Sequence, residues 1–183
     1  MKIEKDVVVF ADTDFLSSFL RIGLERLLIE VLSDNELRVP YTVAKEINDY
    51  HDSDLINRFN NLVNDGYFVL EPEIPVDSEE FNFIMHFVSL EDPKYPIFGE
   101  GESEALALAY FNDGYIASNN LKHIAIPCHD FHINYFSSID ILKKAYKSKI
   151  KTLDELDIIW GKMKTVQKLP QYDSFSEYLS KGD

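Results

Sequence analysis

The sequence predicts an α/β fold with a central, mainly parallel sheet flanked by helices. Two observations carry this prediction. Residues 7–10 form a continuous apolar run rich in β-branched side chains, which is typical of a strand buried on both faces. Further short apolar runs recur along the chain, separated by segments with apolar residues at helical spacing. Strands joined by helices pair in parallel, and the helices cover the two faces of the sheet.

In the first half of the chain, turn residues separate the expected elements. These elements are a helix or a broken pair over 15–32, a strand over 37–39, helices over 42–50 and 54–63, and a strand over 67–70. The second strand stops at Pro40, because the residue before a proline disfavours helical backbone. Thr42 is the expected N-cap of the helix that follows. Asp65 and Gly66 mark the turn into the third strand.

The second half continues the alternation. We expect a loop over 71–75, a helix over 79–90, a surface loop over 91–101, a buried helix over 102–111, a strand over 115–117, a helical stretch after it, a strand over 133–136, and helices over 139–146 and 153–163. Two prolines and two glycines place the loop over 91–101 at the surface. The helix over 102–111 is almost entirely apolar after an acidic first turn, which indicates burial.

Length and composition favour one compact, soluble protein. The 183 residues suffice for one domain, and 45% apolar residues exclude intrinsic disorder. No apolar run reaches the roughly eighteen residues of a membrane span, so no membrane partner is expected. The first ten residues resemble a strand and lack a cleavage pattern for a signal peptide. The single cysteine, Cys128, permits no internal disulfide, which suits the cytoplasm.

The formal net charge of −14 argues against broad electrostatic attraction to nucleic acid. Any such contact has to be local. One lysine cluster lies within nine residues, and it is either a solvated helix face or a patch that contacts phosphates. Its members are Lys143, Lys144, Lys147, Lys149 and Lys151.

Acidic residues occupy positions where parallel strands end and helices begin. Asp12 follows the first strand, Glu102 and Glu104 open the buried helix, and Ser118 and Asn119 follow a later strand. Ligands of open parallel sheets bind outside the carboxyl ends of the strands, so these residues are expected on one rim. Mg²⁺ and Mn²⁺ prefer oxygen ligands and are usually held by several carboxylates.

Three stretches carry a resemblance to a known family: "VVVFADTDFLSSF", "VPYTVAKEI" and "GEGESEALALA". In order and rough spacing they resemble the motifs of the PIN domain, a nuclease family related to the FEN-type fold. Asp12 and Thr13 match the end of its first strand, with Asp14 in the third place, and Glu46 matches its second acidic position. Residues 101–105 reproduce the Gly-Glu-x-Glu-Ala of one bacterial and archaeal branch.

The resemblance covers about residues 1–150 and implies a PIN-like three-layer α/β/α domain. Residues 151–183 are expected to form a helical extension that packs on this domain or serves a partner.

The fourth acidic position of the family, commonly Thr/Ser-Asp-Asp, is altered here to Ser118-Asn119-Asn120. An asparagine offers a carbonyl oxygen to a metal but supplies no negative charge. One metal ion is still expected to bind, whereas a second ion needs compensation from Asp14 or from the doubled glutamates.

The resemblance implies a metal-dependent ribonuclease that hydrolyses single-stranded or looped RNA, similar to the toxins of toxin–antitoxin pairs. Water is the nucleophile, and Asp12, Glu46 and Glu102 or Glu104 hold Mg²⁺ or Mn²⁺. Asn119 is a neutral ligand or water anchor, and the lysines at 143, 144 and 147 contact RNA phosphates. The residues expected just outside the ligands are Thr13, Asp14, Ser118 and Asn120. The expected protein partners are an antitoxin-like protein and a second copy of the chain.

Each acidic residue also has a structural explanation. Asp12 is placed to cap the next helix, Glu46 to lie on a solvated face, and Glu102 and Glu104 to favour a helix N-terminus through its dipole. The alternative function is therefore a catalytically silent PIN-like domain that binds a protein or RNA. A zinc site in "HDFH", residues 129–132, is disfavoured because no second ligand pair accompanies it, and Cys128 is expected to be an unreactive thiol.

Overall fold

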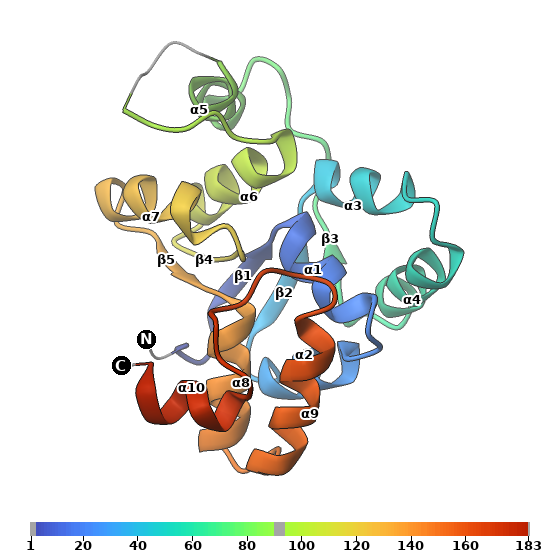
Figure 1. The fold of residues 1–183 in the computed structure, drawn as a ribbon. Coiled ribbons are helices and arrows are strands. Elements are labelled where there is room, and N and C mark those ends of the chain that lie inside the picture. The colour runs from blue at the N-terminus through green and yellow to red at the C-terminus, as the bar shows by residue number, and fades with distance from the viewer. Residues whose placement is uncertain (1–2, 90–93, 183) are drawn as a thin grey trace.

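A parallel sheet forms the centre of the molecule in the computed structural model, which describes residues 3–89 and 94–182 (Figure 1). Within those residues the sheet has five strands in the order β3-β2-β1-β4-β5, and every neighbouring pair is parallel. The strands are β1 (Val8–Ala11), β2 (Glu36–Val39), β3 (Val69–Leu70), β4 (Tyr115–Ala117) and β5 (Asn134–Phe136). The predicted α/β fold class is confirmed.

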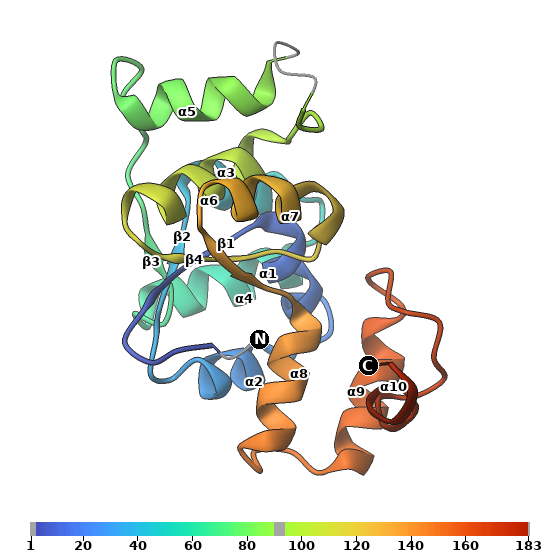
Figure 2. The ribbon, with the colours of Figure 1, turned by 90° about the vertical axis from the view of Figure 1, so that its left-hand side faces the viewer.

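Helices connect the strands and cover both faces of the sheet. They are α1 (Thr13–Leu20), α2 (Glu25–Val31), α3 (Tyr41–Asn48), α4 (Ser53–Asn64), α5 (Glu79–Val88), α6 (Glu100–Phe111), α7 (Leu121–Asp130), α8 (Ser138–Lys147), α9 (Leu153–Met163) and α10 (Phe175–Lys181). Figure 2 shows α6 and α7 on one side of the sheet with α5 outside α6, and α1, α2 and α4 on the other side. The three layers follow from this arrangement.

Alternation along β1 builds one apolar core on each face of the sheet. Val9 and Ala11 belong to the larger core with α1, α2 and α4, whereas Phe10 belongs to the second core with α6 and α7. Successive strand side chains point to opposite faces, so one strand serves both cores. All three side chains are fully buried, as expected for the middle strand of a covered sheet.

Several predicted boundaries change in the structure. The stretch over 15–32 is a broken pair of helices, α1 and α2, and Gly23 between them adopts a φ of +66° that favours glycine. Thr42 is not an N-cap, because α3 begins one residue earlier and Pro40 holds the cap position. The helix over 79–90 ends at Val88.

The buried helix α6 starts at Glu100, so the last two residues of the predicted loop over 91–101 are helical. Residues 90–93 lie outside the described residues, and with them the end of the predicted helix over 79–90 and the start of that loop.

The C-terminal residues add two helices to the larger core. Trp160 of α9 and Phe175 of α10 are fully buried in that core, and the Trp160 ring stacks on Tyr178 with 5.3 Å between centroids. Asp157 accepts hydrogen bonds from the backbone N–H and the hydroxyl of Ser176, which joins the two helices. Among the described helices, none combines the length and apolar character needed to cross a membrane.

Candidate active site

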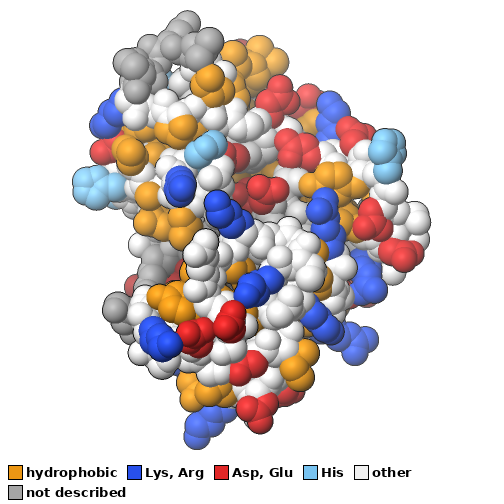
Figure 3. All heavy atoms as spheres, viewed as in Figure 1, with side chains coloured by type: hydrophobic (Ala, Val, Ile, Leu, Met, Phe, Trp, Pro, Cys, Tyr) orange, Lys and Arg blue, Asp and Glu red, His pale blue; other side chains and the backbone are white. Residues whose placement is uncertain are grey.

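A small cavity of about 310 Å³ opens at the carboxyl ends of β1 and β4. Its walls come from the residues that follow these strands, from α3 and from the start of α6. The lining residues are Asp12, Thr13, Asp14, Glu46, Tyr50, Gly99, Glu102, Asn120 and His123. Figure 3 shows Asp and Glu side chains together on this face of the molecule, between α3 and α6. We refer to this cavity as the acidic pocket.

Asp12 joins the end of β1 to the start of α1. Its backbone N–H donates to the Ala117 carbonyl at 3.0 Å, and its Oδ1 accepts from the Phe15 N–H at 2.6 Å. The side chain therefore caps α1 and lines the acidic pocket at the same time. Burial raises the Asp12 pKa to about 7, although hydrogen bonds from the Ser118 hydroxyl and the Phe15 N–H favour the charged form.

Glu46 reaches the acidic pocket from α3 and is fixed by two neighbours. The Thr13 hydroxyl donates to its Oε2, and the Gly101 N–H donates to its Oε1 at 3.3 Å. A side chain at position 101 would crowd this carboxylate, because a Cβ there would lie 3.0 Å from both Glu46 oxygens. Glycine at this position thus permits the close approach of α6 to Glu46.

Glu102 lies in the first turn of α6 and faces the acidic pocket. Its Oε2 lies 3.3 Å from His123 Nδ1, and the Asn120 side chain donates to the same carboxylate. Its Oε1 is buried without a hydrogen-bond partner among the described residues. Burial raises the Glu102 pKa to about 7, opposed by the Asn120 hydrogen bond and reinforced by the charge of Asp14.

Glu104 does not reach the acidic pocket. Two residues along a helix correspond to a rotation of about 200°, so Glu104 leaves α6 on nearly the opposite side from Glu102. Its carboxylate accepts from the backbone N–H groups of Tyr41 at 3.2 Å and Thr42 at 2.8 Å. Glu104 therefore satisfies the free N–H groups at the start of α3, which is why Thr42 is not needed as an N-cap.

The structure places Asn120, and not Asn119, in the acidic pocket. Asn119 donates from Nδ2 to the Ser18 hydroxyl at 3.4 Å and accepts at Oδ1 from the Ser138 N–H at 3.0 Å. It thereby connects the end of β4 to α1 and α8. The assignment of Asn119 as a ligand or water anchor is corrected accordingly, because both ends of its amide are used in the scaffold.

Three residues that line the acidic pocket were not predicted as site residues: Tyr50, Gly99 and His123. His123 follows Asn120 by one helical turn at the start of α7, and Tyr50 follows Glu46 by four residues. His123 lies in the first turn of α7, three residues after the N-cap Asn120, which is a usable signal, whereas Tyr50 lies beyond the end of α3 and no helical spacing relates it to Glu46. Thr13 and Asp14 line the acidic pocket as well, and the Ser118 hydroxyl accepts from the Asn120 N–H at 3.0 Å.

Comparison with known proteins gives a likeness of fold. No family model matches the sequence. No curated protein matches it either. Among solved structures, a chain of the VapBC2 complex from Rickettsia felis, crystallised with a DNA fragment from its promoter, is similar with a TM-score of 0.52 at 11% identity. The similarity covers 71% of this chain and 98% of that chain. The fold is PIN-like.

The acidic pocket of this PIN-like fold suits a single divalent cation better than a pair. In the described part of the chain, no three His, Cys, Asp or Glu side chains come close enough together to hold a metal ion. Asp12 and Glu102 nevertheless fit one ion, since Mg²⁺ in proteins is often held by one or two carboxylates and water. Glu102 Oε1, which has no hydrogen-bond partner among the described residues, supports this fit, whereas both Glu46 oxygens and Asp12 Oδ1 already accept hydrogen bonds.

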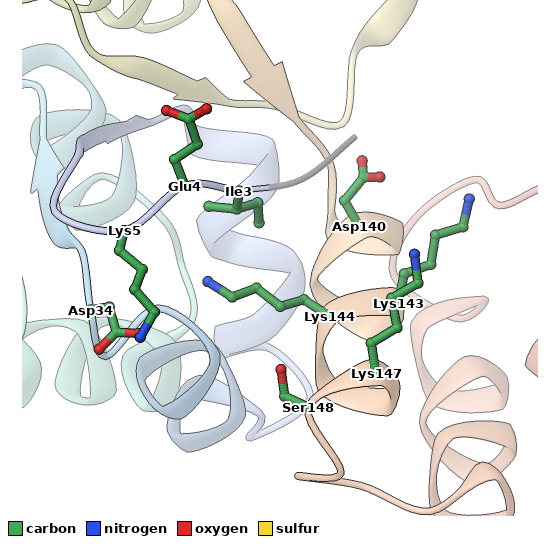
Figure 4. Close-up of a pocket in the computed structure, with 9 residues that line it drawn as sticks. All are labelled: Ile3, Glu4, Lys5, Asp34, Asp140, Lys143, Lys144, Lys147 and Ser148. Carbon is green, nitrogen blue, oxygen red and sulfur yellow. The ribbon is translucent and has the colours of Figure 1, made fainter.

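The predicted RNA-contacting lysines lie at the opposite end of the sheet. Lys143, Lys144 and Lys147 of α8 line a second cavity together with residues that precede β1 and β2 (Figure 4). The structure does not bring them to the acidic pocket.

Cys128 and the "HDFH" stretch, residues 129–132, lie outside the acidic pocket. Cys128 is buried, and burial raises its pKa to about 12, which keeps the thiol protonated. Asp130, between the two histidines of the "HDFH" stretch, accepts from the Tyr95 hydroxyl at 2.9 Å and pairs with Lys94 at 2.7 Å. Its carboxylate therefore already interacts with Lys94 and Tyr95, which lie between α5 and α6.

Proposed function

We propose that this chain is a metal-dependent ribonuclease that hydrolyses phosphodiesters of single-stranded or looped RNA at the acidic pocket. One observation carries the proposal: Asp12, Glu46 and Glu102 come from three different elements and line one cavity at the carboxyl ends of the parallel strands. Burial raises the pKa of two of them to about 7, which is a frequent property of catalytic carboxylates. The PIN-like fold supports the same reading.

Asp12 and Glu102 would hold Mg²⁺ or Mn²⁺ in this pocket. When bound, the ion supplies positive charge that polarises the scissile phosphate and lowers the pKa of water. Glu46 is kept in place by Thr13 and Gly101, and Asn120 orients Glu102 through its hydrogen bond. Glu102 Oε1 has no hydrogen-bond partner in the described part of the chain, so this atom is available to a cation or to the proton of an attacking water.

The proposal includes a biological setting. We place the protein in the cytoplasm as a toxin-like ribonuclease, with an antitoxin-like protein as its partner and a homodimer as its assembly. The similar solved chain belongs to a complex, VapBC2, that binds promoter DNA.

Cleavage of a fluorescently labelled single-stranded RNA in Mn²⁺ tests the proposal. We expect Asp12→Asn and Glu102→Gln each to reduce the rate at least about 100-fold, since each removes one of the two proposed ligands. Asp12→Asn retains an oxygen that can accept from Phe15 and should fold. The matched control is Glu100→Gln, which removes an exposed acidic charge from the same helix, α6, outside the acidic pocket and should cleave within a few-fold of wild type.

Equal residual cleavage by all four proteins would indicate a contaminating nuclease and overturn the proposal.

A specific observation favours the second candidate function, a binding module without catalysis: Asn120 stands in the pocket where a carboxylate would complete a set of ligands. RNA binding that is unaffected by Asp12→Asn, without detectable cleavage by wild type, would establish that function.

A further inference from the structure

A second cavity of about 730 Å³ lies at the amino end of the sheet. One wall is the segment before β1, which contributes Ile3 and Lys5, and the other is α8. Figure 4 shows Lys144 extending from α8 toward the segment that carries Ile3 and Lys5. Since these residues precede β1, the cavity opens on the side of the sheet away from the acidic pocket.

Basic side chains are concentrated around this cavity. Four of the 18 lysines and arginines of a chain with net charge −14 line it: Lys5, Lys143, Lys144 and Lys147. Lys5 pairs with Asp34 at 2.9 Å, and the Lys143 ammonium lies 5.0 Å from the centre of the Tyr178 ring. Neither Lys144 nor Lys147 forms an ion pair with a described residue. Figure 4 shows the Lys144 ammonium directed toward Lys5 across the cavity, whereas Lys143 and Lys147 extend away from Lys144, so an anion in the cavity would lie between Lys144 and Lys5.

The three carboxylates that line the cavity already have partners, in one case Lys5 of the cavity itself. Asp34 pairs with Lys5, Glu4 interacts with the Tyr115 hydroxyl, and Asp140 accepts from the Ser137 N–H and hydroxyl in a capping box. The Lys144 pKa is lowered, mainly because partial burial disfavours its charged form, and Lys5 adds repulsion against the attraction of Asp34. An anionic ligand would relieve the cost of holding these ammonium groups together.

We propose that this cavity binds a small polyphosphate anion of the nucleoside di- or triphosphate class. Lys144 contacts the phosphates from α8 with Lys5 across the cavity, and Lys147 and the Ser148 hydroxyl contact them at the margin of the cavity. Its volume falls within the range of about 300–1,000 Å³ typical of small-molecule pockets. Ile3 and the aliphatic stems of the lysines provide apolar surface for a nucleoside. The acidity of the whole chain disfavours a long polyanion such as RNA.

Isothermal titration of the full-length protein with ATP, ADP and inorganic tripolyphosphate tests the proposal. The titrations are done in EDTA, so that they depend neither on a cation nor on cleavage. We expect saturable binding, weakened about tenfold or more in the double variant Lys144→Gln/Lys147→Gln, because two charge-assisted contacts are lost. The matched control, Lys162→Gln/Lys168→Gln, loses the same charge outside the cavity and should bind within twofold of wild type. Circular dichroism melts establish that both variants fold.

Three results would overturn the proposal. They are the absence of saturable binding by wild type, an equal loss of affinity in the two double variants, and a single-stranded RNA that binds with the same lysine dependence while ATP does not compete. Tripolyphosphate binding without any gain from the nucleoside of ATP would overturn the nucleotide assignment. None of these results bears on RNA cleavage at the acidic pocket, which the Asp12 variant tests separately.

Discussion

In the acidic pocket, Asp12 and Glu102 are the two carboxyl groups whose pKa values the fold shifts most clearly. Both have a pKa raised to about 7, chiefly because burial disfavours their charged form, and the charge of Glu102 further raises the pKa of Asp12. At neutral pH without a cation, the pocket therefore holds protons that the unfolded chain has already released. A bound cation would displace them, because it favours the charged carboxylates.

A pH dependence of stability follows from these two pKa values. Between about pH 4 and pH 7 these two carboxyl groups bind more protons in the folded than in the unfolded chain, so their contribution to the free energy of unfolding falls as pH rises. In EDTA, we expect Asp12→Asn to make this slope shallower, by up to about 1.4 kcal/mol per pH unit for one group. Urea denaturation at a series of pH values measures the slopes, and identical slopes for wild type and Asp12→Asn would refute the expectation.

The two adjacent asparagines allow a comparison within the fourth motif. Asn120→Asp adds a carboxylate to the acidic pocket beside Glu102, so we expect Mn²⁺ affinity to increase about tenfold or more. Asn119→Asp removes the donor to Ser18 and leaves the pocket unchanged, so its affinity should match wild type. Calorimetric titration with Mn²⁺ measures both, and a gain from Asn119→Asp alone would mean that Asn119 is the site residue.

Sequence reasoning found the acidic positions but not the direction of each side chain. Asp12, Glu46 and Glu102 were predicted as site residues because strand ends and ordered motifs bring them to one rim, and the structure places them there. The position of Glu104 could have been excluded from helix geometry, since it leaves α6 about 200° away from Glu102. The roles of Asn119 and Asn120 could not be separated, because they depend on contacts with α1 and α8, which are distant in sequence.

At the scale of elements, the contact between α3 and α6 depends on Gly101. A methyl group there would lie 3.0 Å from both Glu46 oxygens and from Val43 Cγ2, which is tighter than ordinary packing. We expect Gly101→Ala to displace Glu46 and slow RNA cleavage, and to cost about 1–3 kcal/mol in packing against a gain of about 1 kcal/mol in helix propensity. Urea denaturation and the cleavage assay measure the two effects.

Gly161 in α9 provides the matched control for this substitution. Nothing lies within 4 Å of a Cβ at that position, so Gly161→Ala should gain about 0.5–1 kcal/mol in stability and leave cleavage unchanged. Two variants with the same effect on stability and cleavage would show that the contact of Gly101 with Glu46 is unimportant.

Most elements could be predicted because their signals are local. The predicted strand over 115–117 and the predicted helix over 153–163 begin and end at the same residues as β4 and α9, since apolar periodicity and turn residues define them. The start of α3 was misplaced because its cap comes from Glu104, a residue on another helix. The predicted helical extension over 151–183 gave no bounds for α10, because only Phe175 of its residues is buried and its apolar pattern is short.

At the scale of the whole molecule, the C-terminal helices share the core of the sheet domain. Trp160 and Phe175 lie in the same apolar cluster as Val9 of the central strand. We expect Phe175→Ala to cost about 3–5 kcal/mol, as for other buried aromatic residues. Trp160 is the single tryptophan, so its fluorescence reports on α9 and α10 while far-ultraviolet circular dichroism reports on the whole chain.

Both signals should follow one transition during urea denaturation of wild type and of Phe175→Ala, because the core is shared. An earlier fluorescence transition would mean that residues 151–183 unfold as a separate unit.

Glu104 has an effect that extends beyond its two hydrogen bonds. Glu104 belongs to α6 and accepts hydrogen bonds from the start of α3. These bonds join α6, which carries Glu102, directly to α3, which carries Glu46. A substitution that shifted α6 slightly would carry α3 with it and leave the separation of Glu46 and Glu102 nearly unchanged.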